Sequence, residues 1–153
     1  MKNLDKYLSL LSDGQGLLLT SRFSRHYGAE FDIAEGVAIV SKNGCRYFTD
    51  SRYIESAENG IKGFEVLDIA GFGYIKRLND AIADFGITEL GFEEPFLTYA
   101  EFMEYEKHLN CTLVPRNAEI NGFRGVTEHW VLALMRMAQA ISDKAFSVGY
   151  GRI

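Results

Sequence analysis

The fold can be worked out from residues 36–49, which read GVAIVSKNGCRYFT. Two runs of mostly apolar residues, 36–41 and 45–49, flank the tripeptide Lys42-Asn43-Gly44. Asn43-Gly44 can supply the positive φ angles of a type I′ turn, whose twist matches that of paired strands. The stretch therefore predicts a β-hairpin of two antiparallel strands.

Strands and helices alternate outward from this hairpin. Upstream, apolar residues at i, i+3, i+4 and i+7 predict a helix over 4–11, and an apolar run predicts a buried strand over 16–21. Residues 22–35 show no clean period and predict a long loop, a kind of segment that is often functional. Downstream, the pattern predicts helices over 51–59, 73–85 and 98–108 and strands over 63–69, 89–92 and 111–114. This order predicts a three-layer α/β/α sandwich around a mixed sheet of about five to six strands.

Size and composition are those of one globular domain. The chain has 153 residues, of which 47% are hydrophobic and 24% charged, a balance typical of folded α/β or α+β proteins. The net charge of −5 argues against a nucleic-acid partner, because a phosphate-binding surface needs clustered Lys and Arg. No apolar run reaches the roughly 18–20 residues that cross a bilayer, and the polar start argues against a signal peptide. We therefore expect a cytoplasmic protein without membrane contact.

The last helical pattern runs from Glu128 to Phe146 and is broadly apolar. At ~100° per residue, one stripe and its flanks occupy roughly half of the helix circumference. These positions are Trp130, Val131, Leu134, Met135, Met137, Ala138, Ile141, Ala145 and Phe146. So broad an arc favours packing against a further partner, although a helix lying deeply in its own core would show the same pattern.

Motifs spread along the chain, in order and at fitting spacings, resemble the amino-terminal domain of the creatinase/prolidase family of metallopeptidases. Residues 17–21 are similar to the family's apolar strand with T-S, and residues 27–31 to its Y-x-x-G-F stretch. Residues 44–57 are similar to its apolar-T-D-x-R-Y-x-x-x-A signature, and residues 90–93 to its L-G-F-E strand. Residues 123–146 are similar to its linker and to the first helix of its catalytic domain. Glu30 stands where the family usually has glycine.

The resemblance implies a domain order and a role. Residues 1–120 would form the family's amino-terminal domain, with its ribonuclease H-like motif, and residues 121–153 a linker and first helix leading toward an absent pita-bread catalytic domain. That catalytic domain holds two divalent metal ions (Mn, Co or Zn) and cleaves Xaa-Pro bonds. The chain would then be the non-catalytic domain of an Xaa-Pro dipeptidase or aminopeptidase, which supports a homodimer and shapes the access of peptide substrates. Dipeptidase, aminopeptidase and creatinase-like substrates all stay open.

A second hypothesis is a free-standing interaction or small-ligand-binding module that has lost its catalytic domain. Thr127 and Trp130-Val131 motivate it, because the family has Lys at the first position and often acidic residues at the other two. A small-ligand site would need a pocket built from residues 22–31 and Asp50.

The chain itself shows no catalytic or metal-binding motif. A hydrolytic two-metal centre needs several converging carboxylates and an imidazole, but the three histidines show no His-Glu-x-x-His or comparable spacing. Glu93 and Glu94 are neighbours, and neighbouring strand residues point to opposite faces. We interpret them as charges at a loop edge rather than as an acid/base pair. We therefore assign no catalytic residue, no metal ligand and no cofactor to this chain.

The segment 22–31 gathers cations and aromatic rings in an otherwise acidic protein. The resemblance implies that it faces a catalytic pocket, either of its own chain or of a neighbouring subunit. The candidates for substrate access or inter-subunit contact are Arg25, His26, Tyr27 and Phe31. The plainer alternative is a loop held in place by aromatic packing.

Asp50, Arg52 and Tyr53 form the tightest motif of the chain. A carboxylate close to a planar guanidinium can accept two hydrogen bonds at once, which would fix the turn from strand into helix. Asp50 could also cap that helix. We favour this structural role over direct contact with a substrate.

Overall fold

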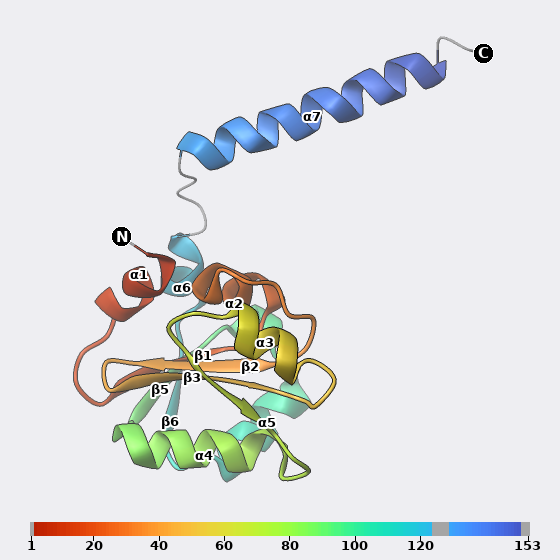
Figure 1. Cartoon of the computed structure of the whole chain (residues 1–153). Coiled ribbons are helices and arrows are strands. Elements are labelled where there is room, and N and C mark those ends of the chain that lie inside the picture. The colour runs from red at the N-terminus through yellow and green to blue at the C-terminus, as the bar shows by residue number, and fades with distance from the viewer. Residues whose placement is uncertain (1, 124–128, 151–153) are drawn as a thin grey trace. The chain divides into compact units, whose positions relative to one another are not determined.

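The structure, a computed structural model, describes residues 2–123 and 129–150. The chain divides into two compact units, Met1–Asn121 and Gly122–Ile153. The first unit is built around a β-sheet, and the second carries the long helix α7, His129–Tyr150 (Figure 1).

A mixed six-stranded sheet with the order β4-β3-β2-β1-β5-β6 forms the centre of the first unit. Strand β2 runs antiparallel to both of its neighbours, and all other neighbouring pairs are parallel. The strands are β1 Gln15–Leu19, β2 Val37–Ser41, β3 Gly44–Thr49, β4 Glu65–Asp68, β5 Glu89–Phe92 and β6 Thr112–Pro115. The predicted α/β class with a mixed sheet is confirmed.

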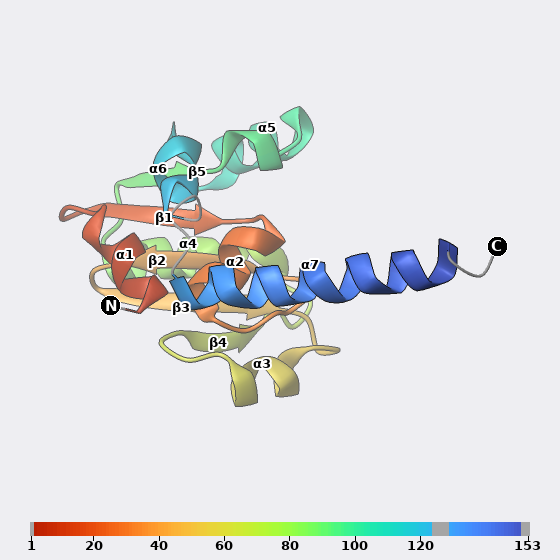
Figure 2. The same cartoon turned by 90° about the horizontal axis from the view of Figure 1, so that it is seen from above.

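Helices cover both faces of the sheet. Four helices lie on one side, and Figure 2 shows two of them, α1 and α2, in front of the sheet with α4 behind it. The four are α1 Asn3–Ser9, α2 Arg22–Ala29, α3 Ile54–Gly60 and α6 Asn117–Gly122. On the other side lie α4 Gly73–Phe85 and α5 Tyr99–His108, the latter preceded by the 3-10 turn η1 Glu94–Phe96.

The central strands are buried on both faces, which explains why they read as continuous apolar runs. In β1, Leu18 belongs to the core cluster that contains Leu78 and Ile82 of α4. Leu17 and Leu19 are buried on the opposite face, since successive strand residues alternate in direction. The buried strand predicted over 16–21 is confirmed as β1.

The predicted hairpin is formed by β2 and β3, but its turn differs from the expectation. Gly44 already belongs to β3, where it pairs with Ser41, and neither Asn43 nor Gly44 has a positive φ. The Ser41 hydroxyl accepts a hydrogen bond from the Asn43 N–H (3.2 Å) and donates one to the Gly44 carbonyl (2.9 Å). Gly44 is needed for space, because a Cβ there would lie 2.3 Å from the Phe85 ring.

The long loop predicted over 22–35 is wrong in its first half, which forms α2. The Ser21 hydroxyl caps this helix by accepting a hydrogen bond from the Ser24 N–H (3.1 Å). The buried face of the helix consists of Ser24, Arg25, Gly28 and Ala29. Because no large apolar side chain lies on this face, the helical period does not appear in the hydrophobic pattern.

Helix α7 accounts for the apolar pattern of the carboxyl-terminal segment. It begins at His129 and ends at Tyr150, close to the predicted bounds, although Glu128 and the linker residues 124–127 lie outside the described residues. One isolated helix cannot bury an apolar arc on itself. Among the helices of the described residues, none is long and apolar enough to cross a membrane.

Candidate functional site

One edge of the sheet collects the polar residues that the sequence singled out. All strands except β2 point the same way, so their carboxyl ends share this edge. The segments that follow β1, β3 and β5 begin with Thr20, Asp50 and Glu93. In open α/β sheets, ligand sites form outside this carboxyl edge, which is therefore the candidate functional site.

Glu93 is fully buried at this edge, with 0% of its surface exposed. Its carboxylate accepts hydrogen bonds from the backbone N–H groups of Thr20 and Ser21 (both 3.1 Å). It also accepts bonds from the hydroxyls of Ser21 and Ser24 (both 2.8 Å). The interpretation of Glu93 as a loop-edge charge is wrong: it holds the amino-terminal end of α2, where a negative charge is favourable, against the end of β5.

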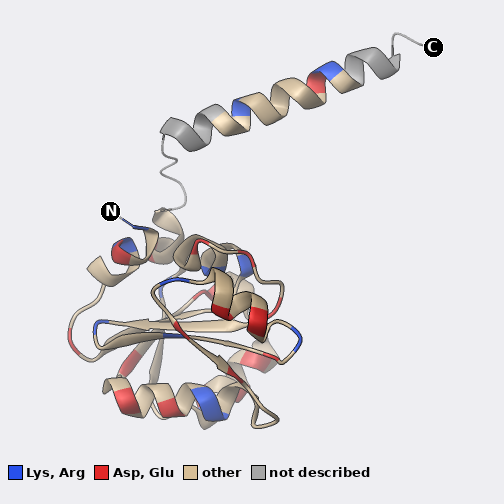
Figure 3. Ribbon diagram, viewed as in Figure 1, with Lys and Arg blue, Asp and Glu red and all other residues tan. Residues whose placement is uncertain are grey.

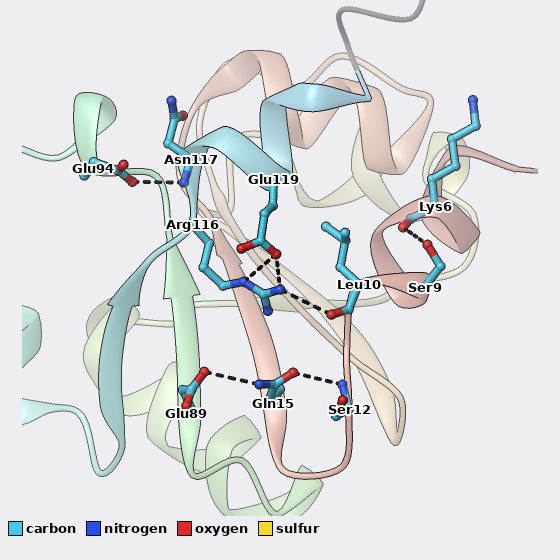
Figure 4. A network of polar contacts seen from close by, with 10 residues as sticks. All are labelled: Lys6, Ser9, Leu10, Ser12, Gln15, Glu89, Glu94, Arg116, Asn117 and Glu119. Atoms are coloured by element: carbon cyan, nitrogen blue, oxygen red, sulfur yellow. Dashed lines mark hydrogen bonds and ion pairs between the residues drawn. The ribbon is translucent and has the colours of Figure 1, made fainter.

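Glu94 fixes a different helix. Its carboxylate accepts a hydrogen bond from the backbone N–H of Asn117 (2.9 Å) at the start of α6. Next to it, the Arg116 guanidinium pairs with Glu119 and donates to the carbonyl of Leu10 (3.3 Å) at the end of α1 (Figure 4). Two neighbouring glutamates thus position two helices, and Arg116 joins α6 to α1.

Arg25 points into the protein, with only 5% of its surface exposed. Its Nη1 donates to the carbonyl of Ile33 (2.9 Å) and to the hydroxyl of Tyr47 (2.6 Å), and its Nε donates to the carbonyl of Thr20 (3.4 Å). Burial raises the pKa of the Tyr47 hydroxyl, against the opposing effect of the nearby Arg25 charge. Arg25 therefore ties α2 to the following loop and to β3.

The other predicted contact residues of this segment are not gathered at one point. His26 is exposed. The Tyr27 ring packs edge-on against Tyr7 of α1, with 5.5 Å between the ring centroids. Phe31 lies against α3, where a Cβ at Gly60 would come within 2.3 Å of its ring. Arg25, His26, Tyr27 and Phe31 thus face the interior, the solvent, α1 and α3 respectively, and their role in substrate access stays a prediction.

A salt bridge that sequence reasoning missed closes the loop after α2. The Arg22 guanidinium donates through Nε and Nη2 to the two carboxylate oxygens of Asp32 (both 2.7 Å). These hydrogen bonds lower the pKa of the Asp32 carboxyl. The two opposite charges stand ten residues apart. This spacing does not predict a contact unless residues 22–29 are known to form a helix.

Asp50 and Arg52 form a bidentate pair after β3. Arg52 donates from Nε to Oδ1 (3.1 Å) and from Nη2 to Oδ2 (2.7 Å), and its backbone N–H also donates to Oδ1 (2.9 Å). The pairing lowers the pKa of the Asp50 carboxyl and raises that of Arg52. The predicted helix cap by Asp50 is not formed: α3 begins at Ile54, with Tyr53 as its N-cap and no side-chain cap.

The described residues do not fit a two-metal centre. Within residues 2–123 and 129–150, no three His, Cys, Asp or Glu side chains come together in a way that could hold a metal ion. We therefore assign no step of a metal-dependent reaction to them.

A family model described as the creatinase/prolidase N-terminal domain matches residues 6–126. The chain belongs to this family. This creatinase/prolidase N-terminal domain is 31% identical, over 132 residues, to the uncharacterized peptidase YqhT of Bacillus subtilis (strain 168). That match covers 86% of the chain and 37% of the relative.

Solved structures share the fold of this creatinase/prolidase N-terminal domain. The Xaa-Pro dipeptidase from Bacillus anthracis is 28% identical with a TM-score of 0.90, and the match covers 100% of this chain and 43% of that one. The X-Pro aminopeptidase from Thermotoga maritima (21% identical, TM-score 0.84) matches over 98% of this chain and 43% of its own. The N-terminal domain of the cytoplasmic peptidase PepQ from Mycobacterium tuberculosis (19% identical, TM-score 0.65) is matched over 96% of its length and 78% of this chain. The chain thus spans less than half of the two longer enzymes.

Proposed function

We propose that this chain is the non-catalytic domain of an Xaa-Pro dipeptidase or aminopeptidase. In this role it supports homodimer formation and shapes the access of peptides to an active site on a separate catalytic domain. The observation that carries the proposal is the likeness to the Xaa-Pro dipeptidase from Bacillus anthracis. The likeness covers all of this chain and only 43% of the length of that enzyme.

The carboxyl edge supplies a suitable access element. The loop after α2 is held at three points: Asp32 pairs with Arg22, the Ile33 carbonyl accepts from Arg25, and Phe31 rests on α3. A loop fixed in this way loses little further entropy when a substrate passes or binds. Such a loop can form the wall of a pocket whose reactive groups lie on another domain.

The proposal includes a cofactor and a location. The two divalent ions, Mn, Co or Zn, would be held by the catalytic domain, where they would acidify a water molecule and polarise the peptide carbonyl. A cytoplasmic location is inferred from the name of the Mycobacterium tuberculosis relative, a cytoplasmic peptidase.

A domain exchange tests this function. Residues 1–121 would replace the amino-terminal domain of the Bacillus anthracis Xaa-Pro dipeptidase, and hydrolysis of an Xaa-Pro dipeptide with Mn²⁺ would be compared with that of the isolated catalytic domain. We expect the chimera to be dimeric by light scattering and faster than the catalytic domain alone. The 153-residue chain by itself should show no turnover.

Variants of the chimera separate access from folding. Phe31→Ala should raise KM with a smaller effect on kcat, because the ring belongs to the proposed access loop. Lys42→Ala, in the hairpin turn at the opposite end of the sheet, should change neither value. Turnover by the chain alone would contradict the proposal, and so would a chimera that stays monomeric and no more active than the catalytic domain.

A further inference from the structure

A hollow opens beside the carboxyl edge, between the loop after α2 and one face of α3. Its volume is about 370 Å³, within the range of roughly 300–1,000 Å³ that small-ligand sites occupy. The residues that line it are Phe31, Arg52, Glu55, Ser56, Asn59 and Gly60.

Two walls of the hollow are fixed by the chain itself. The Phe31 ring lies so close to Gly60 that a Cβ there would come within 2.3 Å of it, so the ring lies directly on the helix backbone. Arg52 is held by Asp50 through its Nε and Nη2 atoms. A ligand would therefore meet an aromatic ring and a guanidinium whose positions are already set.

The unmatched charge of the hollow is negative. Asp50 neutralises Arg52, whereas Glu55 forms no ion pair with any side chain of residues 2–123. Helix α3 carries acidic but no basic positions (Figure 3). An anionic ligand would therefore be disfavoured next to Glu55, and a cationic group would be attracted to it.

The polar groups of the hollow are available for a ligand. Asn59 follows Glu55 by four residues and Ser56 by three, so it neighbours both on the surface of α3, and all three line the hollow. Across the described parts of the chain, their side chains make no hydrogen bond, and neither does the Nη1 atom of Arg52. The hollow thus offers one carboxylate, one amide, one hydroxyl and one free guanidinium nitrogen around an aromatic ring.

We propose that this hollow binds the amino-terminal end of a peptide. The α-ammonium group pairs with the Glu55 carboxylate and lies against the face of the Phe31 ring, an arrangement that favours cations. The first peptide carbonyl accepts a hydrogen bond from Arg52 Nη1 or from the Asn59 amide. The choice of a peptide as the ligand rests on the proposed function, whereas the location of the site does not. The site would give this domain a peptide contact of its own, separate from the active site on a catalytic domain.

A titration of the full 153-residue chain with the dipeptide Ala-Pro tests the site, with backbone amide NMR shifts as the readout. We expect saturable shifts at residue 31 and along 52–60, with a dissociation constant in the millimolar range, because the hollow is open and the ligand small. N-acetyl-Ala-Pro, which lacks the ammonium group, should bind about tenfold more weakly or worse, since a charged hydrogen bond is lost.

A matched pair of variants on α3 identifies the carboxylate. Glu55→Gln keeps the shape and removes the charge, so Ala-Pro binding should weaken about tenfold. Glu58→Gln removes the same charge from the same helix at an exposed position that does not line the hollow, and it should bind as the unchanged chain does. An unchanged amide spectrum outside α3 shows that each variant is folded.

Three results would overturn the inference: no saturable shift at α3, equal binding of the acetylated dipeptide, or equal loss in both variants. The outcome is independent of the chimera assay. If Ala-Pro does not bind but the chimera is active and dimeric, the proposed site is contradicted and the proposed function stands. If Ala-Pro binds as expected but the chimera is inactive, the proposed function is contradicted and the site stands.

Discussion

Two buried charged side chains determine how the segments meet at the carboxyl edge. Glu93 accepts hydrogen bonds from two backbone N–H groups and two serine hydroxyls, and Arg25 donates to backbone carbonyls and to Tyr47. A buried charge is costly unless its hydrogen bonds are satisfied. Replacement of either residue therefore leaves several buried partners unpaired rather than one.

Glu93→Gln should lower the free energy of unfolding by about 2 kcal/mol, because the neutral amide keeps the shape of the side chain but loses charge-assisted hydrogen bonds. Urea denaturation followed by circular dichroism measures the change. Glu94→Gln is the control: its carboxylate is exposed and accepts one backbone bond, so the loss should stay below about 1 kcal/mol. Equal losses in the two variants would show that burial of Glu93 contributes nothing.

Burial raises the pKa of the Tyr105 hydroxyl to about 12, whereas an unfolded tyrosine titrates near pH ~10. Between these values the folded chain binds more protons than the unfolded chain, so the free energy of unfolding falls as the pH rises. Below pH ~10 the contribution of Tyr105 is complete. Urea titrations between neutral and strongly alkaline pH should show a shallower decline for Tyr105→Phe than for the unchanged chain. Tyr99→Phe, at a side chain that is 77% exposed, should leave the slope as it is.

Among the elements, α2 shows how a helix can form with almost no apolar face. Its ends are fixed by polar contacts: Ser21 caps the start together with Glu93, and Glu30 ends the helix in the left-handed region with φ 54°. The family usually has glycine at this position, and glycine adopts this conformation without steric cost.

Two substitutions at Glu30 isolate the strain of this helix end. Both Glu30→Ala and Glu30→Gly remove the hydrogen bond that the Glu30 carboxylate accepts from the Asn3 N–H. Only glycine also relieves the left-handed conformation. The glycine variant should therefore be more stable than the alanine variant by about 1 kcal/mol in urea denaturation. Equal stabilities would mean that the helix end relaxes when the side chain is shortened.

For the whole molecule, sequence reasoning identified the elements that show either a mostly apolar run or a regular apolar period. The strands β1 to β3 are of the first kind and the helix α4 is of the second. The pair of Asp50 and Arg52 was identified because its two residues are close in the sequence. Helix α2 was missed because its buried face is polar and small. The contact between Glu93 and Ser21 was missed because it joins residues 72 positions apart, and only the finished fold brings them together.

The first unit should fold without the carboxyl-terminal segment. All six strands and the core cluster around Leu18 and Leu78 lie within residues 1–121. A protein of residues 1–121 should therefore unfold in one cooperative urea transition, with a free energy in the usual range of about 5–15 kcal/mol. A circular dichroism spectrum of an unfolded chain, or a gradual transition without a baseline, would contradict this expectation.

The consecutive placement of Glu93 and Glu94 also restricts the length of the segment that carries them. Each carboxylate reaches a different helix, so inserting or deleting a single residue between Phe92 and Pro95 would pull one of the two away from its backbone partner. Substitutions at neighbouring surface positions leave this spacing untouched. Over evolutionary time, the connection after β5 should therefore keep its number of residues constant, while positions other than Glu93 and Glu94 vary in residue type.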